Sequence, residues 1–568
     1  MNKGNSLLKF FERDSGKVAI LSVFCIIAHY VFIFQRGLVF EDWMMLGLTQ
    51  KLAAENRFPM AVLLDPLRFF GHTYNCLISY LFRYNPTLYH FQLLFYDILA
   101  TVLVFTLSKR IFRNSLTAFL ATLIFSIFPN NTESHLSVNT SFMKMGFCVN
   151  MMLLIFLADW ISKKKGKIAL SVISLIYFLS LFIYEQGAML PFVFLAMNYL
   201  LLKDIYISER KRIFTFILIS SILLISAFVI KKTNFLGLLQ PIYGGEAWKV
   251  DYKFNIDGLF NFLDIVFYTN YLGVFIMQMK SVYFGLKSMN RLILLLLLMI
   301  DIFICYILFK MKLIKEEGIA YGKNYLYAGL WTMLLFIMPV FMYPFFSSRH
   351  TAYLNIGFCI ILIYLIYHIE IKDLYKRLLL SAFIFMCLLY NQGESYNWVI
   401  AGRLNMGLFE YVCIKKDEII SRKPKAVVIY AGNQYIRSGL GDRYPSHIGN
   451  TVLNGAGYGK VHVGKEIINM SPWVYITWMA LKTNEMLVIS ESRQPMHISN
   501  NMISYYDYES KSYKQIGLNE VYVINMSYIV EKELPHLFSR MEENFGKKQD
   551  LKKEDNPGKP GDFYKPAF

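Results

Sequence analysis

The chain has 568 residues, of which 55% are hydrophobic, 17% aromatic and 17% charged, and its formal net charge is +18. This composition is too apolar for a soluble protein of that length and predicts a polytopic membrane protein. The lysines and arginines stand in short clusters between apolar runs, as in the cytoplasmic loops of membrane proteins, which argues against a nucleic-acid partner. The seven cysteines show no spacing typical of a disulfide framework or a zinc site.

A membrane-spanning helix needs about 20 apolar residues, and about eleven runs of this chain approach or reach that length. They lie at residues 17–34, 88–108, 115–129, 142–160, 168–184, 187–202, 213–230, 290–309, 324–343, 351–368 and 377–391. We therefore predict an α-helical polytopic membrane protein with about eleven transmembrane helices.

Charge orients these predicted helices. Every second connection contains lysine or arginine, whereas the short connections NNTESHLSVNTS and YEQG between them contain neither. Basic loops stay in the cytoplasm, so we expect a cytoplasmic N-terminus and an extracytoplasmic C-terminal segment. Two long connections, residues 35–87 and 231–289, then fall on the outer side, and the second is apolar enough to lie in the interface or re-enter the membrane.

From about residue 392 the composition becomes that of a soluble domain. The short apolar runs AVVIY, MLVIS and EVYVIN are separated by polar or glycine-containing segments, which predicts strands of an α/β module. We expect a membrane domain over residues 1–391, an extracytoplasmic soluble α/β domain over 392–545, and a disordered tail over 546–568, where apolar residues are scarce.

The segment FEDW sets Glu41 and Asp42 side by side after the first predicted span. Consecutive side chains of a helix diverge by about 100°, so only one of them faces a given cavity. We favour Asp42 because it begins the helix-like segment DWMMLGLTQKLAAEN, where the positive end of the helix dipole stabilises a carboxylate. A plain helix cap beside a solvated acid would fit the same residues.

Other polar residues of the predicted outer connections complete the set of candidates. Arg349 departs from the charge pattern in a short outer connection, where its guanidinium either grips the phosphate of a lipid-linked substrate or reaches lipid phosphate at the surface. The remaining candidates for substrate binding, each also compatible with ordinary loop solvation, are Glu133, His135, Glu185, His350, Arg68 and His72.

The order of these segments resembles the GT-C superfamily of membrane glycosyltransferases, which includes the protein O-mannosyltransferases and the aminoarabinose transferases of lipid A. The resemblance covers roughly residues 10–390 and rests on FEDW, NPTLYHFQLLFYDILATVLVFTLSKRIF, FSIFPNNTESHLSVNTS, LSLFIYEQGAMLP and SSRHTAYL. It implies transfer of a sugar from a polyprenyl-phosphate donor to an acceptor outside the membrane. It also implies that Asp42 is the base, with Glu41 loosely matching the second acid in reversed order.

Chemistry is compatible with this implication. Nucleotide-activated sugars stay in the cytoplasm, so an outward-facing transferase needs a lipid-linked donor. A carboxylate base about 3 Å from the acceptor hydroxyl and a cation at the leaving phosphate suffice for one inverting displacement. We expect no required cofactor, although paired acids could hold a divalent metal. The expected partners are the polyprenyl-phosphate-linked sugar, a glycan or lipid-linked acceptor, and membrane lipid.

The absence of an obvious eukaryotic retention signal and a usage rich in Lys, Ile and Asn favour a bacterial inner membrane, with the C-terminal domain in the periplasm. The expected acceptor is an envelope glycan such as the O-antigen of lipopolysaccharide, with protein in second place. Two alternatives stay open. A flippase or other transporter of lipid-linked saccharides would show internal repeats and broken helices at the midplane, and an O-antigen polymerase would lack the C-terminal module.

Overall fold

The computed structural model describes residues 13–39, 42–43, 46, 69–163, 166–233, 267, 271, 273–277, 279–310, 322–339, 350–430, 459–463, 466–470, 472–482, 486–490, 496–499, 501–507, 512–526 and 529.

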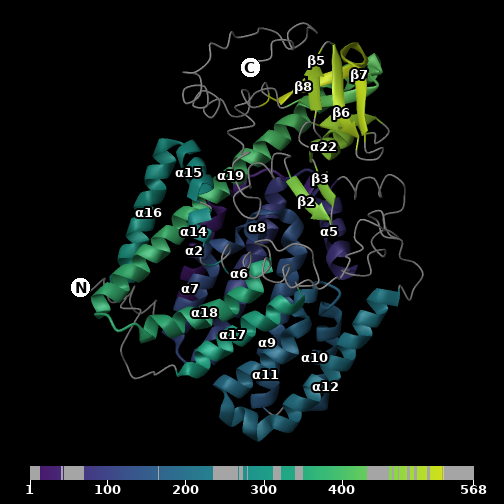
Figure 1. The fold of residues 1–568 in the computed structure, drawn as a ribbon. Coiled ribbons are helices and arrows are strands. Elements are labelled where there is room, and N and C mark those ends of the chain that lie inside the picture. Colours follow the sequence, from purple (N-terminus) through teal and green to yellow (C-terminus); the bar gives the residue numbers. More distant parts are fainter. Residues whose placement is uncertain are drawn as a thin grey trace.

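The described part of the chain is mostly helical, and long helices pack side by side over most of its length (Figure 1). The longer helices are α2 (Asp14–Cys25), α5 (Phe69–Phe82), α6 (Pro86–Phe112), α7 (Ser115–Ile127), α9 (Ser141–Ser162), α10 (Lys167–Ser180), α11 (Leu190–Leu201), α12 (Lys203–Thr233), α15 (Met279–Ser288), α16 (Arg291–Lys310), α17 (Lys323–Ile337), α18 (Thr351–His368), α19 (Asp373–Arg422) and α22 (Pro472–Leu481). The shorter helical turns are η1 (Ile26–Tyr30), η2 (Ile33–Gln35), η3 (Pro129–Asn131), α8 (Thr132–Leu136), η4 (Val138–Thr140), η5 (Glu185–Met189), α14 (Val274–Met277) and η9 (Leu518–Glu520).

Several helices of the described residues have the length and composition of membrane spans, which identifies a helical membrane protein. The six are Asp14–Gln35, Pro86–Phe112, Ser141–Ser162, Tyr206–Ile230, Arg291–Lys310 and Thr351–His368. The other predicted spans coincide with shorter helices, namely α7, α10, α11 and α17, or with part of α19. The total of about eleven transmembrane helices therefore stays a prediction.

Helix α19 differs from the predicted span at 377–391, because it continues without a break to Arg422. The residues beyond 391 are more polar, yet Trp398, Ala401, Leu408 and Val412 keep the helical spacing of a buried face and are at most 8% exposed. The change in composition marks a change in what the helix packs against. It does not mark the end of the helix.

Two opposite ends of the helical body can be distinguished by their contacts. At one end, Asp14 of α2 forms an ion pair with Lys109 of α6 and accepts a hydrogen bond from Ser115 of α7. At the other end, Thr351 of α18 donates to the backbone oxygen of Asn130 at 3.0 Å. The first end carries basic clusters predicted to be cytoplasmic, and the second gathers connections predicted to face outward.

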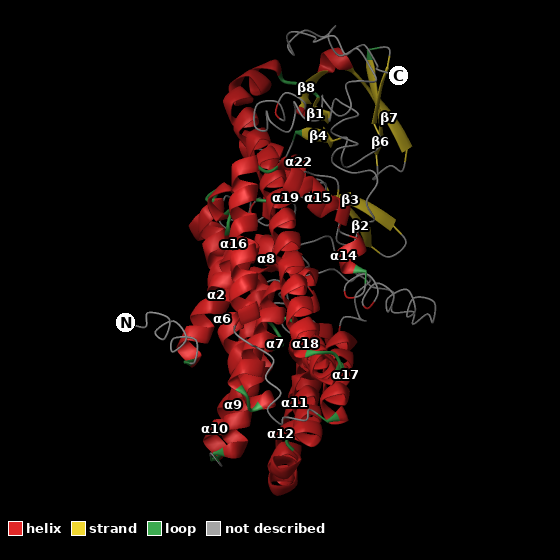
Figure 2. Cartoon of the chain, turned by 90° about the vertical axis from the view of Figure 1, so that its left-hand side faces the viewer, coloured by secondary structure: helices red, strands yellow, loops and turns green. Residues whose placement is uncertain are grey.

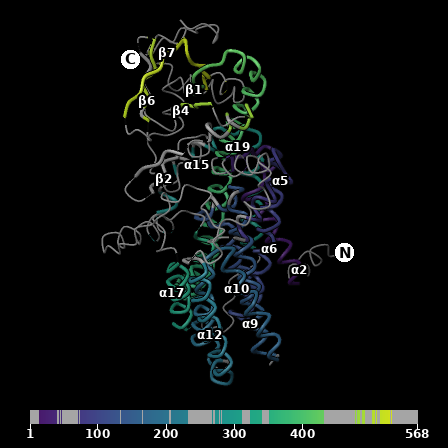
Figure 3. The backbone as a smooth tube through the Cα atoms, turned by 90° about the vertical axis from the view of Figure 1, so that its right-hand side faces the viewer, coloured from purple at the N-terminus to yellow at the C-terminus, as the bar shows by residue number. Residues whose placement is uncertain are grey.

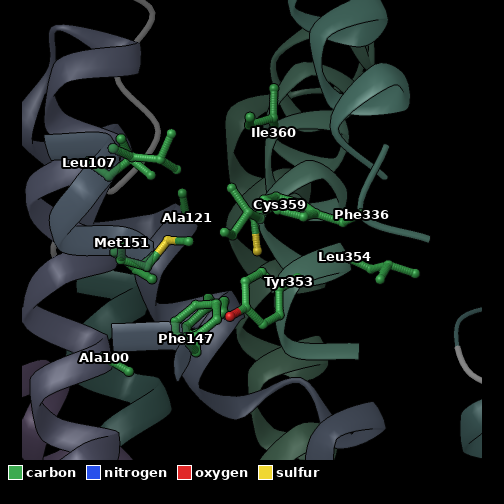
Figure 4. Packing of buried hydrophobic residues seen from close by; sticks show 14 of the residues in the cluster. Ala100, Leu107, Ala121, Phe147, Met151, Phe336, Tyr353, Leu354, Cys359 and Ile360 are labelled. Carbon is green, nitrogen blue, oxygen red and sulfur yellow. The ribbon is translucent and has the colours of Figure 1, made fainter. Parts of the chain in front are cut away.

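Apolar packing fills the interior between these ends. In Figure 4, Tyr353 of α18 lies against Phe147 of α9, with Met151 and Cys359 nearby, and the two ring centroids are 5.0 Å apart. Side chains from α6, α7, α9, α17 and α18 belong to this one core cluster.

The strands of the C-terminal part form three small sheets. In the first, β1 (Ala426–Tyr430) lies parallel between β4 (Leu487–Ser490) and β8 (Val521–Asn525). The other two are antiparallel: β2 (Gly459–Val463) with β3 (Glu466–Met470), and β5 (Met496–Ser499), β6 (Met502–Asp507) and β7 (Ser512–Gly517) in that order. The runs AVVIY, MLVIS and EVYVIN are thus confirmed as strands.

Figures 2 and 3, which view the molecule from opposite sides, show β1, β4, β6 and β7 at one end and α12 at the other, with β2 between them. Val427 and Ile429 of β1 belong to the same apolar cluster as Leu408 and Val412 of α19, so the sheet rests on the end of that helix. An extracytoplasmic domain over residues 392–545 stays a prediction, and the predicted tail lies outside the described residues.

Candidate functional site

The segment that follows the first membrane helix is held against α19 by a contact that only glycine permits. A Cβ atom added to Gly37 would stand 2.4 Å from the backbone oxygen of Gly402. One residue on, the backbone oxygen of Leu38 accepts hydrogen bonds from Trp43 Nε1 at 2.8 Å and from Asn405 Nδ2 at 3.5 Å. These contacts hold Gly37 and Leu38 against α19 and join Leu38 to Trp43.

Asp42 is buried in this segment, with 4% of its surface exposed. Its Oδ2 accepts a hydrogen bond from the backbone nitrogen of Val39 at 3.1 Å, and its own nitrogen donates to the Val39 oxygen at 2.8 Å. Its Oδ1 accepts from the hydroxyl of Ser137 at 3.3 Å. Asp42 and Trp43 are helical, so the carboxylate closes the turn in which the helical conformation begins.

Several predicted site residues cannot be compared with this geometry. Glu41, Arg68 and Arg349 lie outside the described residues. Glu133 in α8 and His72 in α5 belong to described helices, but their side chains lie outside the description.

Two other candidates, Glu185 and His350, lie in adjoining connections that are predicted to face outward. Gln186, next to Glu185 in η5, donates its side-chain amide to the backbone oxygen of His350 at 2.8 Å. The ring of His350, which is 4% exposed, stacks at 6.5 Å on Tyr184. Glu185 itself is half-buried. The structure thus joins the YEQG connection to the start of α18.

The remaining predicted site residue, His135, takes part in a buried charged cluster centred on Asp97 of α6. Asp97 Oδ2 lies 2.8 Å from His135 Nδ1 and accepts a hydrogen bond from the hydroxyl of Tyr30. Its Oδ1 forms an ion pair with Lys144 of α9. Lys144 Nζ is also 3.1 Å from His135 Nδ1. Each of the four residues is less than 10% exposed, so the cluster is a paired charge inside the protein.

Asp97 and Lys144 were not among the residues predicted from the sequence. The available signal was one acid in the apolar run FYDILA and one lysine in SFMKMGF, each inside a predicted span. A charge there is costly unless it faces the protein interior and finds a partner. Two lone charges of opposite sign in two spans therefore indicate a pair, although the sequence does not reveal that the helices are adjacent.

The charged cluster lines a pocket with about 500 Å³ of empty space, open solvent at its mouth included. Its apolar side includes the rings of Phe125 and Phe147, and His29 stacks on His135 with centroids 3.8 Å apart. The polar lining residues are Asp97, Thr101, Ser126, Asn131, Ser134, His135, Lys144, Tyr184 and Tyr353. Hydroxyl, amide and charged groups beside aromatic rings suit a polar ligand with apolar faces.

The pocket and Asp42 are linked by the connection between α8 and α9. His135 lines the pocket, and two residues later Ser137 donates its hydroxyl to Asp42. Burial lowers the pKa of His135 below its ordinary value, with the Asp97 carboxylate acting in the opposite sense. Over the residues that the structure describes, no group of three His, Cys, Asp or Glu side chains is arranged to hold a metal ion.

Comparison with protein-family models and with curated proteins gave no match to this chain. The resemblance to GT-C glycosyltransferases therefore rests on the short motifs quoted above. Function is inferred below from those motifs together with the geometry of the site.

Proposed function

We propose that this protein is a membrane glycosyltransferase that moves a sugar from a polyprenyl-phosphate donor to an envelope glycan at the outer face of a bacterial inner membrane. The observation that supports it most is the buried carboxylate of Asp42, held by hydrogen bonds to both oxygens and joined through Ser137 to the segment that lines the Asp97 pocket. Burying a carboxylate is costly, and a group kept in such a place at a predicted membrane surface is a functional candidate.

The proposed reaction is one inverting displacement. Asp42 takes the proton of the acceptor hydroxyl, and the acceptor oxygen forms a bond to the anomeric carbon. The bond between that carbon and the phosphate oxygen breaks, and its electron pair leaves with the lipid phosphate. Val39 and Ser137 fix the direction of the carboxylate, so it meets the hydroxyl without reorganising.

We assign the transferred sugar to the pocket beside Asp97. Its amide and hydroxyl groups include those of Asn131 and Ser134, which are able to hydrogen-bond sugar hydroxyls. The faces of Phe125 and Phe147 offer apolar contact to the ring. The pocket lies between α6, α7, α9 and α18, and the α8–η4 connection joins it to the carboxylate that acts on the acceptor.

Replacement of the proposed base tests the function. Envelope glycans are compared by mass spectrometry in cells that contain the wild type, Asp42→Asn or Asp14→Asn at matched expression. We expect one sugar residue to disappear with Asp42→Asn, because loss of a general base slows such a step by about 10²–10⁴-fold. Asp14→Asn is the matched control, since Asp14 is 44% exposed at the opposite end of the helices.

Other results would replace the proposal. Full modification by Asp42→Asn excludes this residue as the base. A loss of whole repeat units in place of one sugar would indicate a polymerase. A transporter would show no transfer by purified protein in detergent from a panel of polyprenyl-phosphate sugars, because detergent leaves no two compartments to connect.

A further inference from the structure

Arg36 is a buried cation to which the structure assigns no anion. It directly follows the membrane helix that ends at Gln35, and only 2% of its surface is exposed. Its Nε, Nη1 and Nη2 all lack a hydrogen-bond partner among the residues that the structure describes. Its guanidinium carbon lies 5.2 Å from the centroid of the Tyr30 ring.

The guanidinium of Arg36 remains charged at neutral pH. Burial lowers its pKa to about 10, which is still well above 7. A buried charge without hydrogen bonds is among the costliest arrangements in a folded protein, and truncation of such a group often stabilises the fold. A folded chain retains it where something else supplies the missing acceptors.

The nearby acid is already engaged. Asp97 lies within electrostatic range of Arg36, but its two oxygens are taken by Lys144, His135 and Tyr30. The acceptors that Arg36 lacks must therefore come from outside this cluster.

Arg36 and Asp42 lie at the same place in the fold. The Arg36 guanidinium interacts electrostatically with His90, and the Asp42 carboxylate interacts with Tyr89. Tyr89 and His90 are neighbours in the first turns of α6, so the cation and the acid flank one short stretch of that helix. Gly37, which directly follows Arg36, is held in close contact with Gly402 of α19.

We propose that Arg36 binds the phosphate of a lipid-linked ligand. The planar guanidinium offers five donors in a fork that matches two phosphate oxygens. Because Arg36 directly follows a helix that is long and apolar enough to cross a membrane, we expect it at the depth of the phosphate of an anchored lipid, whereas inorganic phosphate would have to leave water to reach it. The identity of this ligand as the sugar donor rests on the proposed function, in which Arg36 would neutralise the departing phosphate.

Binding of farnesyl phosphate tests the inference without any transfer step. The full-length protein is purified in detergent, and dissociation constants are measured for farnesyl phosphate, farnesol, phosphatidylglycerol and inorganic phosphate. We expect farnesyl phosphate to bind most tightly and Arg36→Gln to weaken it at least tenfold. Arg36→Lys keeps the charge but lacks the fork, and it should give an intermediate loss. Arg403→Gln is the matched control, since Arg403 is a partly exposed arginine that donates to the neighbouring Gln35.

Thermal unfolding separates a binding role from a structural one. In ligand-free protein, Arg36→Gln should keep or raise the unfolding temperature, because it removes an unpaired buried charge. A marked fall would show that Arg36 holds the fold together and would overturn the inference, as would unchanged affinity in Arg36→Gln. If that variant cannot be purified, an Arg36→Lys variant that binds farnesyl phosphate as tightly as the wild type would overturn the inference that the guanidinium fork binds the phosphate.

The comparison between ligands also tests the inference. Equal affinity for inorganic phosphate would overturn the lipid linkage, and equal affinity for phosphatidylglycerol would make this a site for bulk membrane lipid. If farnesyl phosphate binds through Arg36 while Asp42→Asn cells keep their glycans, the anion site stands and Asp42 fails as the base. If glycan modification needs Asp42 but Arg36→Gln binds and transfers normally, only the present inference fails.

Discussion

At the scale of single residues, the polar interior of this membrane protein is organised by one carboxylate. Asp97 forms an ion pair with Lys144 and is bonded to both Tyr30 and His135. These three partners come from three other parts of the chain. Both charges of the pair are almost completely buried, since Asp97 is 5% and Lys144 7% exposed. Their interaction therefore depends on both partners being present, because either charge alone would be buried without compensation.

This dependence is testable by a double-mutant cycle. Lys144→Met and Asp97→Asn should each destabilise the protein by about 3–5 kcal/mol, whereas the double variant should lose less than the sum. Unfolding of purified protein in detergent, followed by tryptophan fluorescence, measures the three values. Lys163→Met serves as the control, because Lys163 pairs with Asp159 at an exposed position. Additive losses would show that the two residues do not act as a pair.

At the scale of elements, the sequence predicts where helices lie better than what they bring together. Apolar runs are sufficient to locate α6, α9, α16 and α18, because a helix that crosses the hydrocarbon of a membrane needs a long stretch of apolar side chains. The sequence does not single out Arg36, because a charge just after a predicted span resembles any charge in a loop. The lack of hydrogen bonds to its guanidinium depends on which side chains surround it, and only the packing of the helices determines that.

The contact between Gly37 and α19 gives a prediction at this scale. Gly37→Ala should lower both the unfolding temperature and glycan modification, because its new methyl group would overlap the backbone of Gly402 and displace the segment that carries Asp42. Overpacking of this kind costs about 1–3 kcal/mol. Gly166→Ala is the control, since an added methyl group there meets no atom within 4 Å. Equal behaviour of the two variants would show that the segment adapts freely.

At the scale of the whole molecule, connections with basic residues and connections without them lie at opposite ends of the helices. The connections predicted to face outward meet through Thr351, Asn130, Gln186 and His350 at one end of the helices, away from the basic end near Lys109. The charge pattern anticipates which connections meet, because loops on one side of a membrane share one surface. It does not anticipate the length of α19, whose C-terminal half is more polar than a membrane-spanning segment.

The sidedness can be tested with a native cysteine. Cys413 in α19 is the one cysteine classed as exposed among the seven, all of which the structure describes. A membrane-impermeant maleimide should label intact spheroplasts through Cys413, and Cys413→Ser should lose the label. Labelling that requires permeabilised membranes would place this end in the cytoplasm, where a lipid-linked donor has no advantage over a nucleotide sugar.

Helix α19 carries a mechanical consequence. Its 50 residues extend about 75 Å, more than twice the roughly 30 Å of membrane hydrocarbon. Along that length it touches α15 at Gly393, the Asp42 segment at Gly402, and the β1 sheet near Leu408. Because the helix is continuous, the strands and the segment that carries Asp42 are attached to one rigid element, and a change in the direction of its C-terminal end would be felt at Gly402.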